Sequence, residues 1–209
     1  MPSPSRAMWE GNAEMARACL SHPFVRGIAD GTLRLESFKF YVSQDAFFLD
    51  SFCRAYALAT AKAPDAEAMR STVRFLEGAL EELKLHGSYA RRWGIELKPK
   101  PDPVTRAYAD FLLRVAWSEP FHRILAAMMP CMKLYFYLGC ELKPEANPGS
   151  PYLDWVKTYS DPMFGELVEE MEGLYDRTAP SLDPTAEENY RNAMELELAF
   201  FEQAYRTAG

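Results

Sequence analysis

Ile124-Leu-Ala-Ala-Met-Met-Pro-Cys-Met-Lys-Leu-Tyr-Phe-Tyr-Leu-Gly139 is part of the most apolar run of the chain. Within and just beyond it, six side chains recur at steps of three and four residues, which is the spacing of one helix face. They are Ile124, Met128, Cys131, Tyr135, Leu138 and Leu142. The spacing predicts a long helix whose inward face carries a thiol and a phenol where aliphatic side chains are usual.

Pro130 and Cys131 give this predicted helix two unusual features. Proline has no N–H and crowds the carbonyl four residues earlier, so we expect a kink beside the thiol and a small polar pocket there. Free cysteines are among the most buried residues and most are inert. Periodicity alone therefore favours a packing role for Cys131, and a reactive role needs support from the rest of the chain.

The remainder of the chain has the same helical period, and no run alternates as a half-buried strand would. The pattern predicts an all-α chain that forms one domain over residues 1–209, a length suited to a single core. The expected helices cover about 5–20, a short piece through His22-Pro-Phe-Val-Arg-Gly-Ile28, then about 35–61, 65–93, 103–117, the segment after Pro120, a short piece around Trp155 and Tyr159, and about 162–178 and 184–206.

Composition limits the partners of the chain. Its net charge is −7 and it has no basic run, which argues against nucleic acid or an anionic membrane as a partner. The N-terminus lacks an apolar signal segment, and run 124–140 contains Pro130 and Lys133 and is too short to span a bilayer. The four cysteines show no CxxC or metal-finger spacing. We expect a cytoplasmic protein with reduced thiols.

Two carboxylates lie on apolar helix faces. Asp45 is the only charge on a stripe otherwise made of Phe38, Tyr41, Phe48, Phe52 and Tyr56. A buried carboxylate must be paired or hydrogen-bonded, or its pKa must rise. Asp45 is therefore either part of a structural network or a group that grips a ligand or transfers a proton.

Glu197 is the second such acid, because it shares the apolar face of the last helix with Tyr190, Met194 and Phe201, whereas Glu195 lies on the polar face. Tyr108 also faces inward, with a hydroxyl that needs a partner. Two inward carboxylates and an inward thiol are unusual in a merely structural core, since each buried acid needs compensation.

The helix expected at 65–93 is rich in charge and predicts a mostly solvated surface with i,i+4 ion pairs. Glu82 and His86 are four residues apart on one face. Two such side chains can ligate a metal. A pair on the protein surface, or a pair that hydrogen-bonds to ligating residues without touching the metal, is the more common arrangement.

Several ordered motifs resemble the TenA family, the thiaminase II enzymes, over about residues 5–206. They are His22-Pro-Phe-Val-x-Gly-Ile-x-Asp-Gly-Thr-Leu33, Phe38-Lys-x-Tyr-Val-x-Gln-Asp45, Pro130-Cys131-x-x-x-Tyr135 with Gly139, Trp155-x-x-x-Tyr159 and Glu197-x-x-Phe200. The resemblance implies a heme-oxygenase-like helical bundle, usually a homotetramer. It also implies hydrolysis of a pyrimidine with a leaving group on its exocyclic methylene, either thiamin or 4-amino-5-aminomethyl-2-methylpyrimidine, in thiamin salvage.

The resemblance also implies residue roles, in the branch of the family that has the cysteine. Cys131 is the nucleophile, Glu197 the proton shuttle, and Asp45 holds the amino edge of the pyrimidine. Tyr108 forms a hydrogen bond near the thiol. The remaining implied contacts are Tyr135 and Tyr159 as polar walls and Phe47 and Phe200 as stacking rings. No metal and no organic cofactor is implied.

Two residues depart from the family pattern. Phe48 stands where many members have a tyrosine that contacts the pyrimidine, so a hydrogen bond worth about 0.5–1.5 kcal/mol is absent. Lys133 stands where an aromatic residue is common. With these changes we expect hydrolysis of the aminomethyl pyrimidine and weak action on thiamin.

Three other functions compete with this interpretation. A di-iron oxidase on the same fold needs several converging Glu, Asp and His ligands, and the chain has three histidines. A non-catalytic regulator finds little support in an acidic chain. A protein that only binds a pyrimidine needs neither the nucleophile Cys131 nor the shuttle Glu197.

Overall fold

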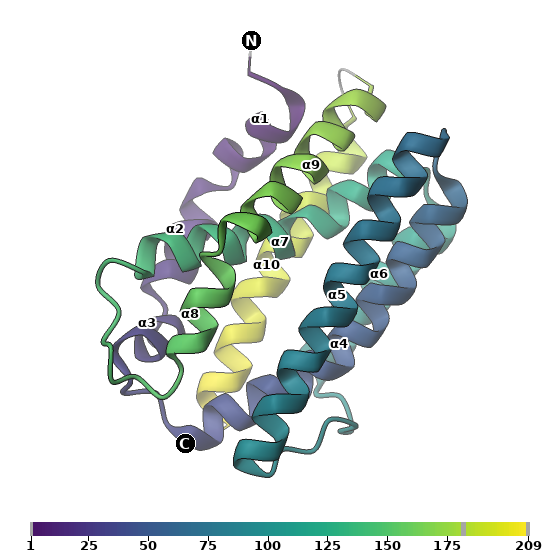
Figure 1. Cartoon of the computed structure of the whole chain (residues 1–209). Coiled ribbons are helices and arrows are strands. Elements are labelled where there is room, and N and C mark those ends of the chain that lie inside the picture. The colour runs from purple at the N-terminus through teal and green to yellow at the C-terminus, as the bar shows by residue number, and fades with distance from the viewer. Residues whose placement is uncertain (1, 181–182, 208–209) are drawn as a thin grey trace.

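The computed structural model describes residues 2–180 and 183–207, and these form helices and connecting loops without a strand. The helices are α1 (Pro4–Gly11), α2 (Ala13–Ser21), α3 (Pro23–Asp30), α4 (Leu35–Lys62), α5 (Ala66–Trp93), α6 (Pro103–Ser118), α7 (Phe121–Leu142), α8 (Leu153–Tyr159), α9 (Pro162–Thr178) and α10 (Pro184–Arg206). The predicted all-α class is confirmed (Figure 1).

The long helices pack around α7 and α10, which contact each other (Figure 1). On one side α4 packs against both α5 and α6, and on the other α7 packs against α8 and α9. Aspartates cap four of the helices, since their carboxylates accept backbone N–H groups of the first turn. These caps are Asp65, Asp102, Asp161 and Asp183.

The prediction of one helix over about 5–20 is wrong, because the chain breaks at Asn12 into α1 and α2. The Asn12 side chain donates from Nδ2 to the carbonyl of Met8 at 2.8 Å and so satisfies a carbonyl at the end of α1. Gly11 and Asn12 both have weak helix propensity. The expected helix through Pro130 forms without interruption as α7.

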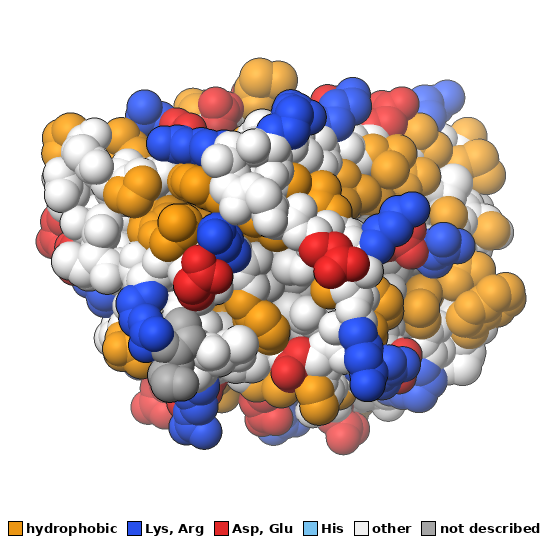
Figure 2. Space-filling view, turned by 90° about the horizontal axis from the view of Figure 1, so that it is seen from below, with side chains coloured by type: hydrophobic (Ala, Val, Ile, Leu, Met, Phe, Trp, Pro, Cys, Tyr) orange, Lys and Arg blue, Asp and Glu red, His pale blue; other side chains and the backbone are white. Residues whose placement is uncertain are grey.

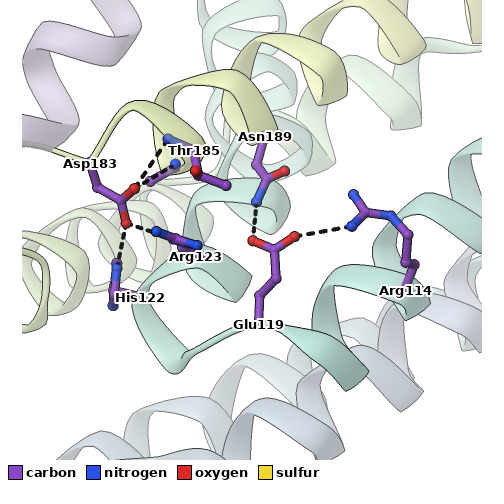
Figure 3. Close-up of polar contacts among 8 residues, drawn as sticks. Arg114, Glu119, His122, Arg123, Asp183, Thr185 and Asn189 are labelled. Atoms are coloured by element: carbon purple, nitrogen blue, oxygen red, sulfur yellow. Dashed lines mark hydrogen bonds and ion pairs between the residues drawn. The ribbon is translucent and has the colours of Figure 1, made fainter.

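A polar network joins the start of α10 to the end of α6 and the start of α7 (Figure 3). Asp183 lies 2.7 Å from both His122 Nε2 and Arg123 Nε. Burial opposes ionisation of Asp183, but the hydrogen bonds from Arg123 and His122 prevail and lower its pKa to about 2. Asn189 donates to Glu119 at 2.9 Å. This network holds α10 in its position along α7.

The surface at one end of the bundle carries both basic and acidic side chains. Figure 2 shows the end of the bundle that lies at the bottom of Figure 1, with basic and acidic side chains interspersed among apolar ones. Neither sign forms a continuous field over that face. Within the two described ranges, each helix is too short or too polar to cross a membrane.

Gly139 allows α7 to approach the end of α8. A Cβ at this position would lie 2.5 Å from the carbonyl carbon of Tyr159 and 2.7 Å from the nitrogen of Ser160. These are backbone atoms that cannot rotate away. We expect Gly139→Ala to lower the free energy of unfolding by about 1–3 kcal/mol, as overpacking does, measured by urea denaturation.

Gly173→Ala is the matched control for Gly139→Ala. Gly173 is an exposed position inside α9, and a Cβ there would meet no described atom within 4 Å. Alanine should therefore stabilise α9 by about 0.5–1 kcal/mol through its helix propensity. Equal effects of the two substitutions would refute the close approach at Gly139.

Candidate active site

Side chains from five helices meet inside the bundle in what we call the acid–thiol cluster. Its members are Asp45 of α4, Glu82 and His86 of α5, Tyr108 of α6, Cys131 of α7 and Glu197 of α10. The three residues predicted to be catalytic are therefore brought together from widely separated parts of the chain.

Glu197 connects the thiol to Tyr108. The Tyr108 hydroxyl donates to Glu197 Oε1 at 2.8 Å. Tyr108 therefore forms its hydrogen bond with Glu197, which lies beside the Cys131 thiol. Burial, followed by the charge of Asp45, raises the pKa of Glu197 to about 8 although the Tyr108 hydrogen bond opposes this. At neutral pH Glu197 therefore carries a proton.

Cys131 is half-buried and packs against the hydrophobic core. Burial, and then the charge of Glu197, raises the pKa of its thiol well above the ordinary value. The thiol is protonated in the free protein, and Glu197 lies near enough for each group to affect the pKa of the other. A nucleophilic attack by Cys131 thus requires removal of this proton during the reaction.

Asp45 forms an ion pair with His86, whose Nε2 lies 2.7 Å from Asp45 Oδ2. The other ring nitrogen, Nδ1, lies 2.9 Å from the backbone carbonyl of Glu82. Both neighbours are acceptors, so both nitrogens must donate and the ring is an imidazolium. Burial alone would lower the pKa of His86, but the hydrogen bond and charge of Asp45 raise it to about 9. The pair orients Asp45.

Glu82 and His86 were expected as a surface pair or as a pair that supports other polar groups, and the structure excludes the surface arrangement because both lie at the cluster. Tyr159 donates its hydroxyl to Glu82. Burial, and then the charge of Asp45, raises the pKa of Glu82 to about 7. The signal that identifies them is the stripe Phe75, Ala79, Glu82, His86, Tyr89 and Trp93, whose spacing of four and three residues marks the inward face of α5.

Aromatic rings surround the cluster. Tyr135 lies 4.8 Å from Tyr159 between ring centroids, and its hydroxyl accepts from Tyr41 at 3.2 Å. Phe48 lies 4.6 Å from the ring of Tyr108 and 6.1 Å from that of Phe200. The predicted wall residues Tyr135 and Tyr159 and the predicted ring Phe200 thus lie beside the acids and the thiol.

The structure does not bring Phe47 into this group. Phe47 follows Asp45 by two residues, a rotation of about 200° around α4, whereas Phe48 follows by three and shares the face of Asp45. Within the described residues, Phe47 is half-buried and does not pack against the hydrophobic core. Phe48 occupies the place that was expected of Phe47.

Lys133, the other departure from the family pattern, points away from the cluster. Its Nζ lies 2.9 Å from Glu172 on α9 and 5.7 Å from the ring centroid of Trp9 on α1. Lys133 therefore links α7 to α9 and α1 outside the acid–thiol cluster.

The three histidines are paired with carboxylates in three separate places. His22 lies 2.8 Å from Glu202, His86 pairs with Asp45, and His122 with Asp183. Among the described residues, no three His, Cys, Asp or Glu side chains form a group that could hold a metal ion. The described residues therefore do not bring together the Glu, Asp and His ligands that a di-iron centre needs.

Two curated proteins resemble the chain over nearly its whole length. It is 31% identical over 95% of its residues to an aminopyrimidine aminohydrolase of Halalkalibacterium halodurans, and it covers 94% of that protein. It is 35% identical over 97% of its residues to the thiamine biosynthesis multifunctional protein ThiED of Corynebacterium efficiens, of which it spans 28%.

Solved structures agree with the fold. A TenA homologue from P. horikoshii OT3 matches with a TM-score of 0.91 and 27% identity over 98% of this chain and 99% of that chain. A domain with a heme oxygenase-like fold from Shewanella denitrificans OS217 matches with a TM-score of 0.78 and 14% identity over 97% of this chain and 92% of that one. The latter confirms the predicted fold class.

Residues 9–207 match the model of the TENA/THI-4/PQQC family. The chain therefore belongs to the TENA/THI-4/PQQC family, as its motifs indicate.

Proposed function

We propose that this protein is an aminopyrimidine aminohydrolase of the thiaminase II type that acts in thiamin salvage, and that residues 1–209 form a single domain. The observation that carries the proposal is the meeting of a thiol, a protonated carboxyl and an oriented carboxylate at Cys131, Glu197 and Asp45. The similarity to the aminohydrolase of H. halodurans over nearly the full length of both chains supports it.

The first step forms a bond between the Cys131 sulfur and a pyrimidine ring carbon. The electrons of the attacked double bond move to a ring nitrogen, which takes the proton of Glu197. The Glu197 carboxylate then accepts the thiol proton. This exchange creates no isolated charge in the buried site, which suits two groups whose raised pKa values keep them neutral beforehand.

The second step breaks the bond between the exocyclic carbon and the leaving group, whose nitrogen keeps the electron pair. The lone pair of the ring amino group supplies the electrons and leaves positive charge on that group. Asp45 is suited to stabilise this charge, because His86 occupies only its Oδ2. Water then adds to the exocyclic carbon and gives a proton to the released base or to solvent, and the returning electrons neutralise the ring amino group. The carbon–sulfur bond breaks, Glu197 gives the proton it took from the thiol back to the sulfur, and the ring nitrogen returns its proton to Glu197 as the aromatic ring is restored.

The working form that we propose is a homotetramer in the cytoplasm, as is usual in the TenA family. The proposed reaction uses no metal and no organic cofactor. Phe48 and Phe200 lie where they can stack on the pyrimidine, next to the acids that bind its polar edge.

The direct test is ammonia release from 4-amino-5-aminomethyl-2-methylpyrimidine by the wild-type protein in the presence of a chelator, with the hydroxymethyl pyrimidine quantified as product. We expect equal amounts of the two products and much slower turnover of thiamin. Comparable rates on both substrates would refute the preference. The absence of turnover on either would refute the enzyme and favour a binding protein.

A further inference from the structure

A cavity of about 700 Å³ lies between α5 and α9, next to the acid–thiol cluster. We call it the α5–α9 cavity. Its apolar lining includes Tyr56, Phe75, Met132 and Leu167. A space of this volume with apolar and aromatic walls suits an organic group the size of a substituted ring.

The charges around the α5–α9 cavity are mostly negative. Five carboxylates and one guanidinium line it: Glu81, Glu82, Asp161, Glu166, Glu170 and Arg74. Arg74 is bound to Glu170, and Glu81 pairs with Lys84. The remaining acids are Glu82, Asp161 and Glu166, and no basic side chain among the described residues pairs with them. The lining thus favours a cation and disfavours an anion.

Glu82 and Tyr159 belong to both the cavity and the cluster. Each lines the α5–α9 cavity, and the Tyr159 hydroxyl donates to Glu82. On its other side Tyr159 contacts the ring of Tyr135, and Glu82 lies near Asp45. Met132, in the cavity wall, directly follows Cys131. A substrate whose pyrimidine lies against the cluster can therefore extend its leaving group past Glu82 into the cavity.

We propose that the α5–α9 cavity is the leaving-group site, that it accepts a positively charged leaving group, and that Glu82 contacts this charge. This inference rests on the proposed function, because it assumes that the pyrimidine binds at the acid–thiol cluster. A primary ammonium or a cationic heteroaromatic ring satisfies the lining. A leaving group that carries a phosphate ester brings negative charge beside Glu82, Asp161 and Glu166 and is rejected.

The test measures binding instead of turnover, with Cys131→Ser protein to prevent hydrolysis. Calorimetry gives Kd for thiamin, for thiamin monophosphate and for the hydroxymethyl pyrimidine, which has no leaving group. We expect thiamin monophosphate to bind at least about tenfold more weakly than thiamin. Adding Glu82→Gln should weaken thiamin binding about three- to tenfold and reduce its advantage over the phosphate, and it should weaken binding of the hydroxymethyl pyrimidine by a smaller factor.

Glu169→Gln is the matched control, because Glu169 is an exposed carboxylate of α9 that does not line the cavity. It should change none of the three Kd values. Equal binding of thiamin and its phosphate, or a Glu82→Gln effect on the hydroxymethyl pyrimidine as large as the effect on thiamin, would overturn the leaving-group site alone. Failure of all three ligands to bind would instead overturn the proposed function together with this inference.

Discussion

Replacing Cys131 with serine is expected to lower kcat for the aminomethyl pyrimidine by at least about 10³-fold, with little change in stability. Serine fits the space that Cys131 occupies, but its hydroxyl is a far weaker acid and a poorer nucleophile at a ring carbon. In wild-type protein, rapid acid quenching followed by intact-mass measurement should reveal a pyrimidine adduct on the peptide that contains Cys131. The variant should show none.

Cys140→Ser controls for the loss of a thiol from the same helix. Cys140 is exposed near the end of α7, away from the acid–thiol cluster. This variant should keep the wild-type kcat and form the adduct. A Cys131→Ser protein that retained even a tenth of the wild-type rate would exclude the nucleophile and point to direct attack by water.

Replacing Glu197 with glutamine is expected to lower kcat/KM by about 10²–10⁴-fold, the usual contribution of a positioned acid–base group. The amide still accepts the Tyr108 hydroxyl, so the geometry at that hydrogen bond is retained. It cannot pass the thiol proton to the ring nitrogen. Glu195→Gln, an exposed change two residues earlier on α10, should leave the rate unchanged.

The pH profile separates a proton shuttle from a structural acid. The folded protein raises the pKa of Glu197 from 4.5 to about 8, so the group is protonated below that pH and loses its proton as pH rises through it. Wild-type kcat/KM should therefore fall above about pH 8. The residual activity of Glu197→Gln should lack this fall. An unchanged alkaline limb in the variant would show that another group titrates there.

Helical periodicity was sufficient to predict the class of the fold and the inward direction of the main site residues. Asp45, Cys131 and Glu197 could be selected because each interrupts an apolar stripe on its own helix. Periodicity says nothing of which helices pack together. The resemblance to the TenA family supplied that information, and the structure shows α4, α7 and α10 in contact.

The sequence predictions were wrong for parts of α5, for Phe47 and for the break at Asn12, each for a different physical reason. The many charges of α5 suggested a solvated helix, yet the stripe from Phe75 to Trp93 is apolar except at Glu82 and His86, the two residues that reach the cluster. Phe47 and Phe48 were both assigned to the site, although adjacent helical residues are about 100° apart and only one can share the face of Asp45. The break at Asn12 depended on a side-chain hydrogen bond that periodicity does not reveal.

The place of α10 in the bundle has a consequence for the order in which the protein matures. This last helix contacts α2, α3, α4, α6 and α7 and carries Glu197, while the thiol is encoded some sixty residues earlier. Because α10 follows α7 in the sequence, the emerging chain displays Cys131 before Glu197 can join it. In the proposed mechanism both groups are needed, so we expect hydrolysis to begin only after α10 has packed against α7.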